Sequence, residues 1–200
     1  MAKIITLAHQ KGGVGKSTLT FNLAMSFQEH LNTCIVDTDP QGSLANLSDE
    51  LDGVTIVQET LVSRIKNLNF EIIFIDTPPY LTNQLSELFA ISDLVLVPTK
   101  AGIFDAMAIR ATLHLIKECQ IKNPNLKYGV VLNMLKHRSG LVPEALGLLN
   151  RFDAFILKTM IYDRAAYARS AVLGRLGNDD PKASTELNQL TEEIVTILAS

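Results

Sequence analysis

Short apolar runs alternate with longer amphipathic segments along the whole chain. Most of these runs are apolar at successive positions, as in IIFI (72–75) and LVLV (94–97), and not only at every second position. Strands that are apolar on both faces are typical of a parallel sheet with helices on each side. The sequence therefore predicts an α/β fold with a mostly parallel twisted sheet and helices on both faces. We expect strands at 3–9, 32–39, 54–58, 71–79, 94–100, 128–135 and 154–161, and helices at 17–31, 42–51, 59–68, 82–93, 105–120, 140–152, 163–173 and 184–199.

Length and composition fit one folded domain. The chain has 200 residues, of which 47% are hydrophobic and 20% are charged, so it can bury a sizeable core. It contains no internal repeat, linker or low-complexity segment, and we expect residues 1–200 to form a single domain.

Several features predict a cytoplasmic protein. The sequence has no stretch of 18 apolar residues that could span a membrane, and its first segment, MAKIITLAHQ, lacks the design of a signal peptide. The two cysteines, Cys34 and Cys119, lie far apart in the sequence, and we expect both to be reduced thiols. The four histidines do not have the spacing of a metal site.

A glycine-rich segment, KGGVGKST (11–18), follows the first predicted strand and leads into the first predicted helix. Backbone N–H groups at such a junction can surround an anion, and glycine lets the backbone approach phosphate oxygens closely. Gly15, Lys16 and Ser17 match the end of the P-loop pattern G-x-x-x-x-G-K-[ST]. Gln10 stands where that pattern has its first glycine, so the loop is of a variant form. We expect Lys16 to contact the β- and γ-phosphates of a nucleotide and Ser17 to coordinate Mg²⁺.

Three carboxylates lie at the ends of predicted strands. Asp37 and Asp39 close the strand NTCIVDTD, and Asp76 closes IIFID. Because ligands of open parallel sheets bind outside the carboxyl ends of the strands, these residues and the glycine-rich segment should converge on one site. Residues i and i+2 of an extended segment point the same way, so Asp37 and Asp39 could both face a nucleotide.

Taken together, KGGVGKST (11–18), DTDPQGS (37–43) and IIFIDTPP (72–79) resemble the motifs of the ParA/MinD family of deviant Walker-A ATPases. Within that family the chain is most similar to small plasmid-partition ParA proteins of the ParF type. The segment IYDRAAYARSAVLG (161–174) extends the likeness, less specifically. The resemblance implies a P-loop NTPase that hydrolyses ATP with Mg²⁺ and forms a homodimer when ATP is bound.

The resemblance also implies roles for individual residues. Lys11 would reach across the dimer interface to the nucleotide of the other subunit, where its charge would stabilise the transferring phosphoryl group. Asp39 would position the attacking water, Asp37 would support the water shell of Mg²⁺, and Asp76 resembles the Walker-B acid that holds this shell. The expected catalytic residues are Lys11, Lys16 and Asp39; the expected metal residues are Ser17, Asp37 and Asp76; the expected nucleotide contacts are Lys11, Gly12, Gly13, Val14, Gly15, Lys16, Ser17, Thr18 and Asn133.

Two of these contacts depend on position alone. Thr18 sits at the helical position after Ser17 and is expected to bond the α-phosphate. Asn133 ends the run VVLN (130–133), where it could either contact adenine or form a turn. The sequence favours neither interpretation of Asn133.

The net charge of −3 hides an uneven distribution. Residues 101–175 carry 11 lysines and arginines against 5 acidic residues, whereas the segments on either side are acidic. A cationic segment could be an electrostatic footprint for nucleic acid, but solvated helix faces would give the same pattern. Arg164, Arg169 and Arg175 lie on or beside one short predicted helix, and we expect them to contact DNA phosphates.

Several functions share these motifs. The first is a DNA-partition ATPase that dimerises with ATP, binds DNA non-specifically at the nucleoid and is reset by a ParB- or ParG-like centromere-binding adaptor. A MinD-like membrane-cycling ATPase would need basic residues in its last amphipathic helix, and the segment 184–199 has none. An iron–sulfur relative would need suitably placed cysteines, and a tyrosine-kinase relative would need a tyrosine cluster after Tyr167; the chain fits neither. The sequence favours partition of plasmid or chromosome DNA without a membrane partner, with membrane cycling or positioning of another cargo as the alternative.

Overall fold

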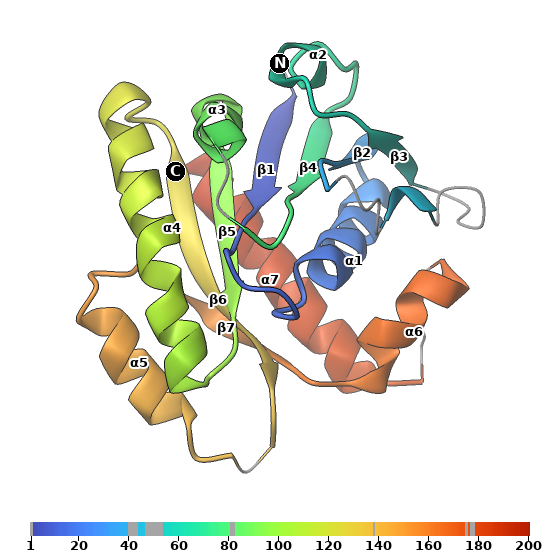
Figure 1. Ribbon diagram of the computed structural model, residues 1–200. Coiled ribbons are helices and arrows are strands. Elements are labelled where there is room, and N and C mark those ends of the chain that lie inside the picture. Colours follow the sequence, from blue (N-terminus) through green and yellow to red (C-terminus); the bar gives the residue numbers. More distant parts are fainter. Residues whose placement is uncertain are drawn as a thin grey trace.

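The computed structural model describes residues 2–39, 44–46, 54–80, 83–137, 139–174, 176 and 179–200. Its strands are β1 (Lys3–Leu7), β2 (Thr33–Asp37), β3 (Thr55–Gln58), β4 (Ile72–Asp76), β5 (Leu94–Thr99), β6 (Lys127–Leu135) and β7 (Ile156–Tyr162). Its helices are α1 (Lys16–Gln28), α2 (Val62–Ile65), α3 (Asn83–Ile91), α4 (Ile103–Lys122), α5 (Val142–Asn150), α6 (Ala165–Leu173) and α7 (Pro181–Ala199). Figure 1 shows their arrangement.

The seven strands of the described residues form one sheet, in the order β3-β2-β4-β1-β5-β6-β7. Every pair of neighbouring strands is parallel, and β1 is central between β4 and β5. The strands β2, β4 and β5 are buried at every position, which explains why their sequences are continuously apolar. The predicted α/β fold is therefore confirmed, and the sheet is parallel throughout.

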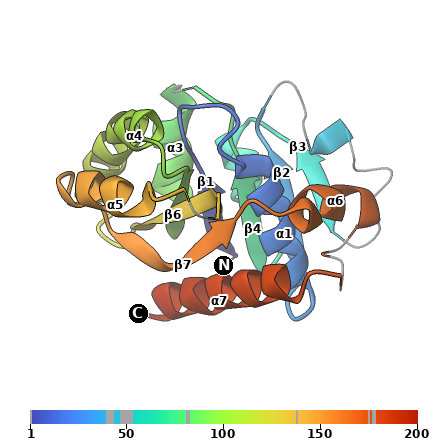
Figure 2. The same ribbon diagram turned by 90° about the horizontal axis from the view of Figure 1, so that it is seen from below.

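Helices cover both faces of the sheet, as Figure 2 shows. One core contains Phe89 of α3 together with side chains of α4 and α5. The other core contains Phe21 of α1 together with side chains of α6 and α7. Successive strand residues point to opposite faces, so Ile4 belongs to the first core and Ile5 to the second.

The last helix, α7, packs its apolar face against the body, as expected, and runs along the edge strand β7. Two of its glutamates accept backbone N–H groups of that strand. Glu193 accepts from Lys158 at 2.8 Å and from Thr159 at 3.0 Å. Glu186 accepts from Tyr162 at 3.1 Å. These carboxylates satisfy donors that an uncovered edge strand would present to solvent.

One predicted helix differs from the described structure, and another cannot be compared along most of its length. The predicted helix 59–68 shortens to α2, because the Glu59 side chain accepts the N–H groups of Thr60 and Leu61 at 2.9 Å each and holds this segment outside the helix. The predicted helix 42–51 lies largely outside the described residues. Among the helices that are described, none is long and apolar enough to cross a membrane.

Candidate functional site

The predicted site residues meet at the carboxyl ends of the central strands. The strand β1 leads directly into the glycine-rich loop. The register places Leu7 of β1 and Asp37 of β2 opposite Asp76 of β4. Asp37 and Asp76 are therefore buried neighbours at one edge of the sheet. The three sequence motifs come together here, as the parallel topology requires.

Glycines with positive φ shape the loop. Gly13 has a φ of 69° and Gly15 a φ of 84°, a region that side chains rarely adopt. A Cβ on Gly15 would also lie 2.5 Å from Nδ2 of Asn133. That amide group donates to the carbonyl oxygen of Val14 at 2.8 Å, so Asn133 anchors the loop from β6. The result is a fixed loop from which α1 starts at Lys16.

Lys16 is buried at the first position of α1. Its Nζ lies 3.5 Å from the carbonyl oxygen of Lys11, so the side chain folds back over the loop. Burial lowers the pKa of the Lys16 ammonium group, while Asp76 and Asp39 raise it. A cation beside the N–H groups of a helix N-terminus is suited to phosphate oxygens.

The Ser17 hydroxyl donates to Oδ2 of Asp76 at 2.6 Å and so joins the first motif to the third. Burial raises the pKa of Asp76 to about 7, the hydrogen bond from Ser17 lowers it, and the nearby Asp37 raises it further. An adjacent hydroxyl and carboxylate supply the hard oxygen ligands that Mg²⁺ prefers, and a bound cation would offset the cost of the buried charge. The residues at this point therefore fit a Mg²⁺ ion.

Asp37 has different surroundings from Asp76. Its Oδ1 accepts the N–H group of Asp39 at 2.9 Å, and its Oδ2 accepts those of Leu44 and Ala45 at 2.9 and 3.1 Å. One carboxylate thus holds the chain on both sides of residues 40–43. We conclude that Asp37 fixes the backbone of Asp39, in addition to the expected role in the water shell of a metal, which stays a prediction.

A cavity of about 240 Å³ opens beside the loop, where β6 and β7 end and α6 begins. Asn133 lines it from inside β6, so the interpretation of this residue as a turn former is wrong. Tyr162 at the end of β7 also lines it and stacks on His137, with ring centroids 4.4 Å apart. Sequence reasoning assigned no nucleotide contact to several of its lining residues, namely Met134, Tyr162, Asp163, Arg164, Tyr167 and Ala168. Their position at or after the carboxyl end of a parallel strand was the signal that could have identified them.

Lys11 pairs with the start of α4. Its Nζ lies 2.6 Å from Oδ1 of Asp105 in the first turn of that helix. The Gln10 side chain donates to the carbonyl oxygen of Ala108, and His9 Nδ1 accepts the backbone N–H of Lys11 at 2.9 Å. Gln10, which stands where common P-loops have a glycine, therefore ties the loop to α4.

The first turns of α4 also carry an exposed apolar surface. Ile103, Phe104 and Met107, all in the first turns of α4, are 53, 83 and 42% exposed. We call these three side chains the α4 patch. Exposed apolar side chains gathered on one helix are typical of a surface that contacts another molecule.

The three arginines predicted to contact DNA have different environments. Arg164 is the N-cap of α6, and its guanidinium group lies 2.6 Å from Oε1 of Glu186 in α7. This partner largely neutralises the Arg164 charge, so the geometry does not favour it as a phosphate contact. Arg169 is exposed and lies 3.1 Å from Oδ2 of Asp179, which is exposed as well. Arg175 lies outside the described residues.

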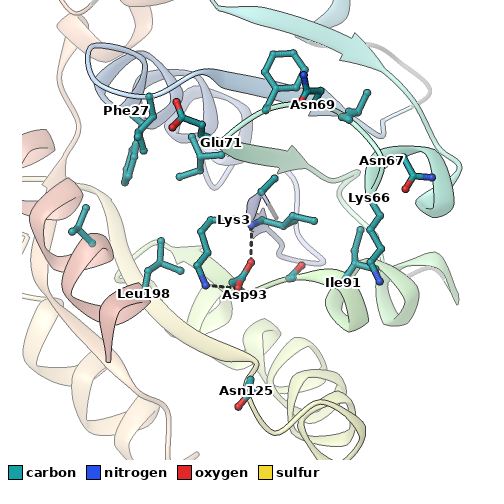
Figure 3. A pocket seen from close by; sticks show the side chains of 18 of the residues that line it. Lys3, Phe27, Lys66, Asn67, Asn69, Glu71, Ile91, Asp93, Asn125 and Leu198 are labelled. Atoms are coloured by element: carbon teal, nitrogen blue, oxygen red, sulfur yellow. Dashed lines mark hydrogen bonds and ion pairs between the residues drawn. The ribbon is translucent and has the colours of Figure 1, made fainter.

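A larger cavity, of about 980 Å³, lies at the opposite edge of the sheet, where β1 and β4 begin. Figure 3 shows Asp93 at its floor, held by the Lys3 ammonium group at 2.8 Å and the Ile4 backbone at 2.9 Å. The Asp93 carboxylate is thus engaged in holding the start of β1. Neither the glycine-rich loop nor a strand carboxyl end contributes to this cavity, so its size does not mark the site.

A family model described as "CobQ/CobB/MinD/ParA nucleotide binding domain" matches residues 5–175. The chain is 28% identical to the Maintenance of carboxysome distribution protein A of Halothiobacillus neapolitanus, over 96% of this chain and 95% of that protein. It is 24% identical to the Chromosome-partitioning ATPase Soj of Thermus thermophilus, over 86% of this chain and 85% of that protein. Among solved structures, a McdA variant from Cyanothece in complex with ATP matches with a TM-score of 0.78 and 16% identity, over 97% of this chain and 96% of that chain.

Proposed function

The chain belongs to the CobQ/CobB/MinD/ParA nucleotide binding domain family, and on that premise we propose that it is a ParA-like ATPase of the partition type. It binds ATP with Mg²⁺, dimerises, binds DNA without sequence preference and moves DNA with a ParB- or ParG-like centromere-binding adaptor. The 2.6 Å contact between Ser17 and Asp76, beside the buried Lys16, is the observation that carries the proposal. A hydroxyl and a strand-end carboxylate at the foot of a P-loop are what a phosphate-bound Mg²⁺ ion needs.

Phosphoryl transfer depends mostly on placement and on charge stabilisation. In the proposed site the glycine N–H groups and Lys16 hold the phosphates, and Thr18 bonds the α-phosphate. Ser17 and Asp76 hold Mg²⁺ and its waters. The bound ion supplies positive charge to the β- and γ-phosphate oxygens.

Hydrolysis in this proposal uses the aspartates after β2. Asp39 positions the attacking water, and Asp37 keeps the Asp39 backbone in place through the 2.9 Å hydrogen bond. A lone subunit turns over slowly, because the second positive charge, Lys11, is paired with Asp105 of its own subunit. Contact with a second subunit and with the adaptor raises the rate.

The second subunit completes the site. Lys11 leaves Asp105 and contacts the phosphates bound by the partner subunit. The α4 patch lies in the same first turns of α4 as Asp105 and gives the two subunits an apolar contact. Burial of an exposed phenylalanine such as Phe104 favours this association.

DNA binding has one well-placed candidate among the described arginines. Arg169 is exposed on α6, and among the described residues the exposed Asp179 is the one acidic side chain paired with it. Contacts to phosphates carry no sequence information, so binding is independent of sequence. Arg175 is proposed to act beside it, whereas Arg164 contributes little because Glu186 neutralises it.

A cargo other than DNA is the second candidate. It is favoured by the 28% identity to a protein named for maintaining carboxysome distribution. The same ATP-gated dimer serves either cargo in this proposal, and the adaptor decides between them. Membrane cycling has less support, because the last helix uses its apolar face to pack on the body.

The proposal is tested by measuring ATP binding, dimerisation and phosphate release for the wild type, Lys16→Ala and Asp39→Ala. We expect Lys16→Ala to lose ATP binding, and Asp39→Ala to bind ATP and dimerise but release little phosphate. Random-sequence duplex DNA is then titrated with ATP, ADP and no nucleotide, and we expect tight binding with ATP alone. A wild type that does not bind ATP would refute the ATPase proposal. Equal DNA binding in all three nucleotide states would refute the proposal that DNA binding requires bound ATP.

A further inference from the structure

Glu186 of α7 is the common acceptor for one wall of the cavity beside the glycine-rich loop. Its Oε1 accepts from Nε and Nη2 of Arg164 at 3.0 and 2.6 Å. Its Oε2 accepts the backbone N–H of Tyr162 at 3.1 Å and lies 3.4 Å from the hydroxyl of Tyr167, which also donates to the Ala183 carbonyl oxygen at 2.9 Å. The carboxylate is nearly buried, with 12% of the side chain exposed. One carboxylate thus fixes three residues that come from two different elements.

The same three residues line the cavity of about 240 Å³, together with Gly15 and Thr18 of the loop. Their arrangement is layered, because Tyr162 stacks on His137 and the Arg164 guanidinium carbon lies 5.7 Å from the centroid of the Tyr162 ring. The nucleoside of a nucleotide with its phosphates on the loop needs a space beside the loop. This cavity opens there, next to Gly15 and Thr18.

We propose that Glu186 is a positioning residue for the nucleoside of the bound nucleotide. It does not line the cavity itself, but it holds Tyr162, Arg164 and Tyr167 in the orientation that forms the wall. The inference rests on the proposed nucleotide site. It adds a segment that the family match over residues 5–175 does not include, because Glu186 belongs to the last helix.

The charges around Glu186 fit this role. Its main partner, Arg164, is also 3.5 Å from Asp180, so the guanidinium group lies between two carboxylates of α7 and its N-cap. The hydrogen bond to Glu186 is the largest cause that raises the pKa of Arg164. In Glu186→Gln one of the two oxygens becomes an NH2 donor, so either Arg164 or Tyr162 loses its acceptor in a nearly buried place, which is costly.

Glu193 provides a matched control on the same helix. Its carboxylate also accepts two backbone N–H groups of β7, those of Lys158 and Thr159. None of these three residues lines the cavity. Glu193→Gln should therefore reproduce the general effect of weakening the contact between α7 and β7, without an effect on the nucleoside.

The test is calorimetric titration of the wild type, Glu186→Gln and Glu193→Gln with Mg²⁺-ATP, Mg²⁺-ADP and inorganic triphosphate. We expect Glu186→Gln to bind both nucleotides about tenfold more weakly, because donors of the wall lose an acceptor. Its affinity for inorganic triphosphate should stay within about twofold, since the loop is untouched. Glu193→Gln should bind all three ligands as the wild type does. If Glu186→Gln does not fold, Arg164→Lys keeps the charge but loses the two-atom pairing, and it should show the same selective loss.

Three outcomes would overturn the inference. One is unchanged nucleotide affinity in Glu186→Gln. Another is an equal loss for inorganic triphosphate, which would mean general damage to the loop. The last is an equal loss in Glu193→Gln, which would mean that helix packing alone matters. A wild type that binds no nucleotide would instead remove the proposed function on which the inference rests.

Discussion

Nζ of Lys11 lies 2.6 Å from Oδ1 of Asp105, so the lysine assigned to another subunit's nucleotide is held by its own subunit in this structure. The two side chains are 44 and 16% exposed. An ion pair at this level of exposure contributes only ~0–1 kcal/mol to stability. Lys11 can therefore leave Asp105 and contact phosphate oxygens at a low cost in free energy when a dimer forms.

Lys11→Ala should bind ATP with nearly normal affinity, because Lys16 and the glycine N–H groups remain. It should fail to form the ATP dimer, and its turnover should fall by about a hundredfold or more, since a preorganised charge at the phosphates is lost. Sedimentation at micromolar protein with ATP and a phosphate-release assay measure both effects. Lys3→Ala, which removes an exposed lysine paired with Asp93 at the far edge of the sheet, is the control. Normal dimerisation and turnover would make Lys11 a loop residue only.

Asp105→Asn should have the opposite effect on assembly. Lys11 then has no carboxylate to leave, so the ATP concentration that gives half-maximal dimer should fall by about two- to fivefold. Sedimentation across an ATP series gives this midpoint. Glu118→Gln removes another carboxylate from α4, one that pairs only with the exposed His114, and should leave the midpoint unchanged. An unchanged midpoint in Asp105→Asn would contradict a restraining role for the pair.

Asp37→Asn should lower the free energy of unfolding by ~2 kcal/mol, because one accepting oxygen becomes an NH2 donor and either Asp39 or Leu44 and Ala45 lose their acceptor. Turnover should fall more than ATP affinity, since the backbone of Asp39 loses its support. Urea unfolding, ATP titration and phosphate release separate these effects. Equal losses in affinity and turnover would argue against a specific effect on Asp39.

Asp76→Asn should stabilise the metal-free, nucleotide-free protein, and more so at high pH. The pKa of Asp76 rises from 3.8 to about 7 on folding, so ionisation favours the unfolded chain. This cost is absent below the unfolded pKa, grows as the pH rises between the two values and is complete above the folded pKa. For a pKa that rises by about three units, ionisation of Asp76 lowers the free energy of unfolding by at most ~4 kcal/mol. The variant should therefore melt roughly 5 °C or more above the wild type at alkaline pH.

Calorimetry in EDTA at acidic and alkaline pH measures this difference. The melting temperatures of the variant and the wild type should converge as the pH approaches 3.8, the pKa of Asp76 in the unfolded chain. The same variant should lose Mg²⁺-dependent ATP binding. A gain in stability that does not change with pH would show that the buried charge of Asp76 is not its cause.

Arg169→Ala should weaken binding to every duplex alike if α6 contacts DNA. The slope of log affinity against log salt should flatten by ~0.9 for each phosphate contact that is lost. Asp179→Asn should strengthen binding, because it removes the carboxylate that lies 3.1 Å from Arg169. Arg64→Ala, another exposed and singly paired arginine, is the control. Identical slopes for the wild type and Arg169→Ala would remove Arg169 from the DNA surface.

The sheet and the phosphate loop could be predicted because their signals are local. Continuous apolar runs specify buried parallel strands, and parallel strands bring their carboxyl ends to one edge. The sequence therefore predicts Asp37 and Asp76 beside the loop, and the register of β2 and β4 places them opposite each other. Gly15 was expected from the P-loop pattern, and the close approach of Asn133 is a second reason for a glycine at this position.

The remaining contacts depend on how distant elements pack. Asp105 was expected to open a helix, but α4 begins earlier, at Ile103, and this places the carboxylate in the first turn within reach of Lys11. Glu186 reaches Tyr162 and Arg164 only because α7 lies along β7. Arg164 lies in a segment of the sequence that is rich in positive charge. In the fold, however, Glu186 of α7 lies beside it and offsets that charge.

The carboxylate of Glu193 against Lys158 and Thr159 has a consequence for assembly into filaments. Chains can join by extending a sheet from one molecule to the next. This requires unpaired N–H groups on the edge strand that can donate to a new strand. At β7 these groups are already bonded within the molecule, and α7 covers the strand. Growth by sheet extension is therefore blocked at the β7 edge, and a polymer contact on this side must be built through side-chain surfaces.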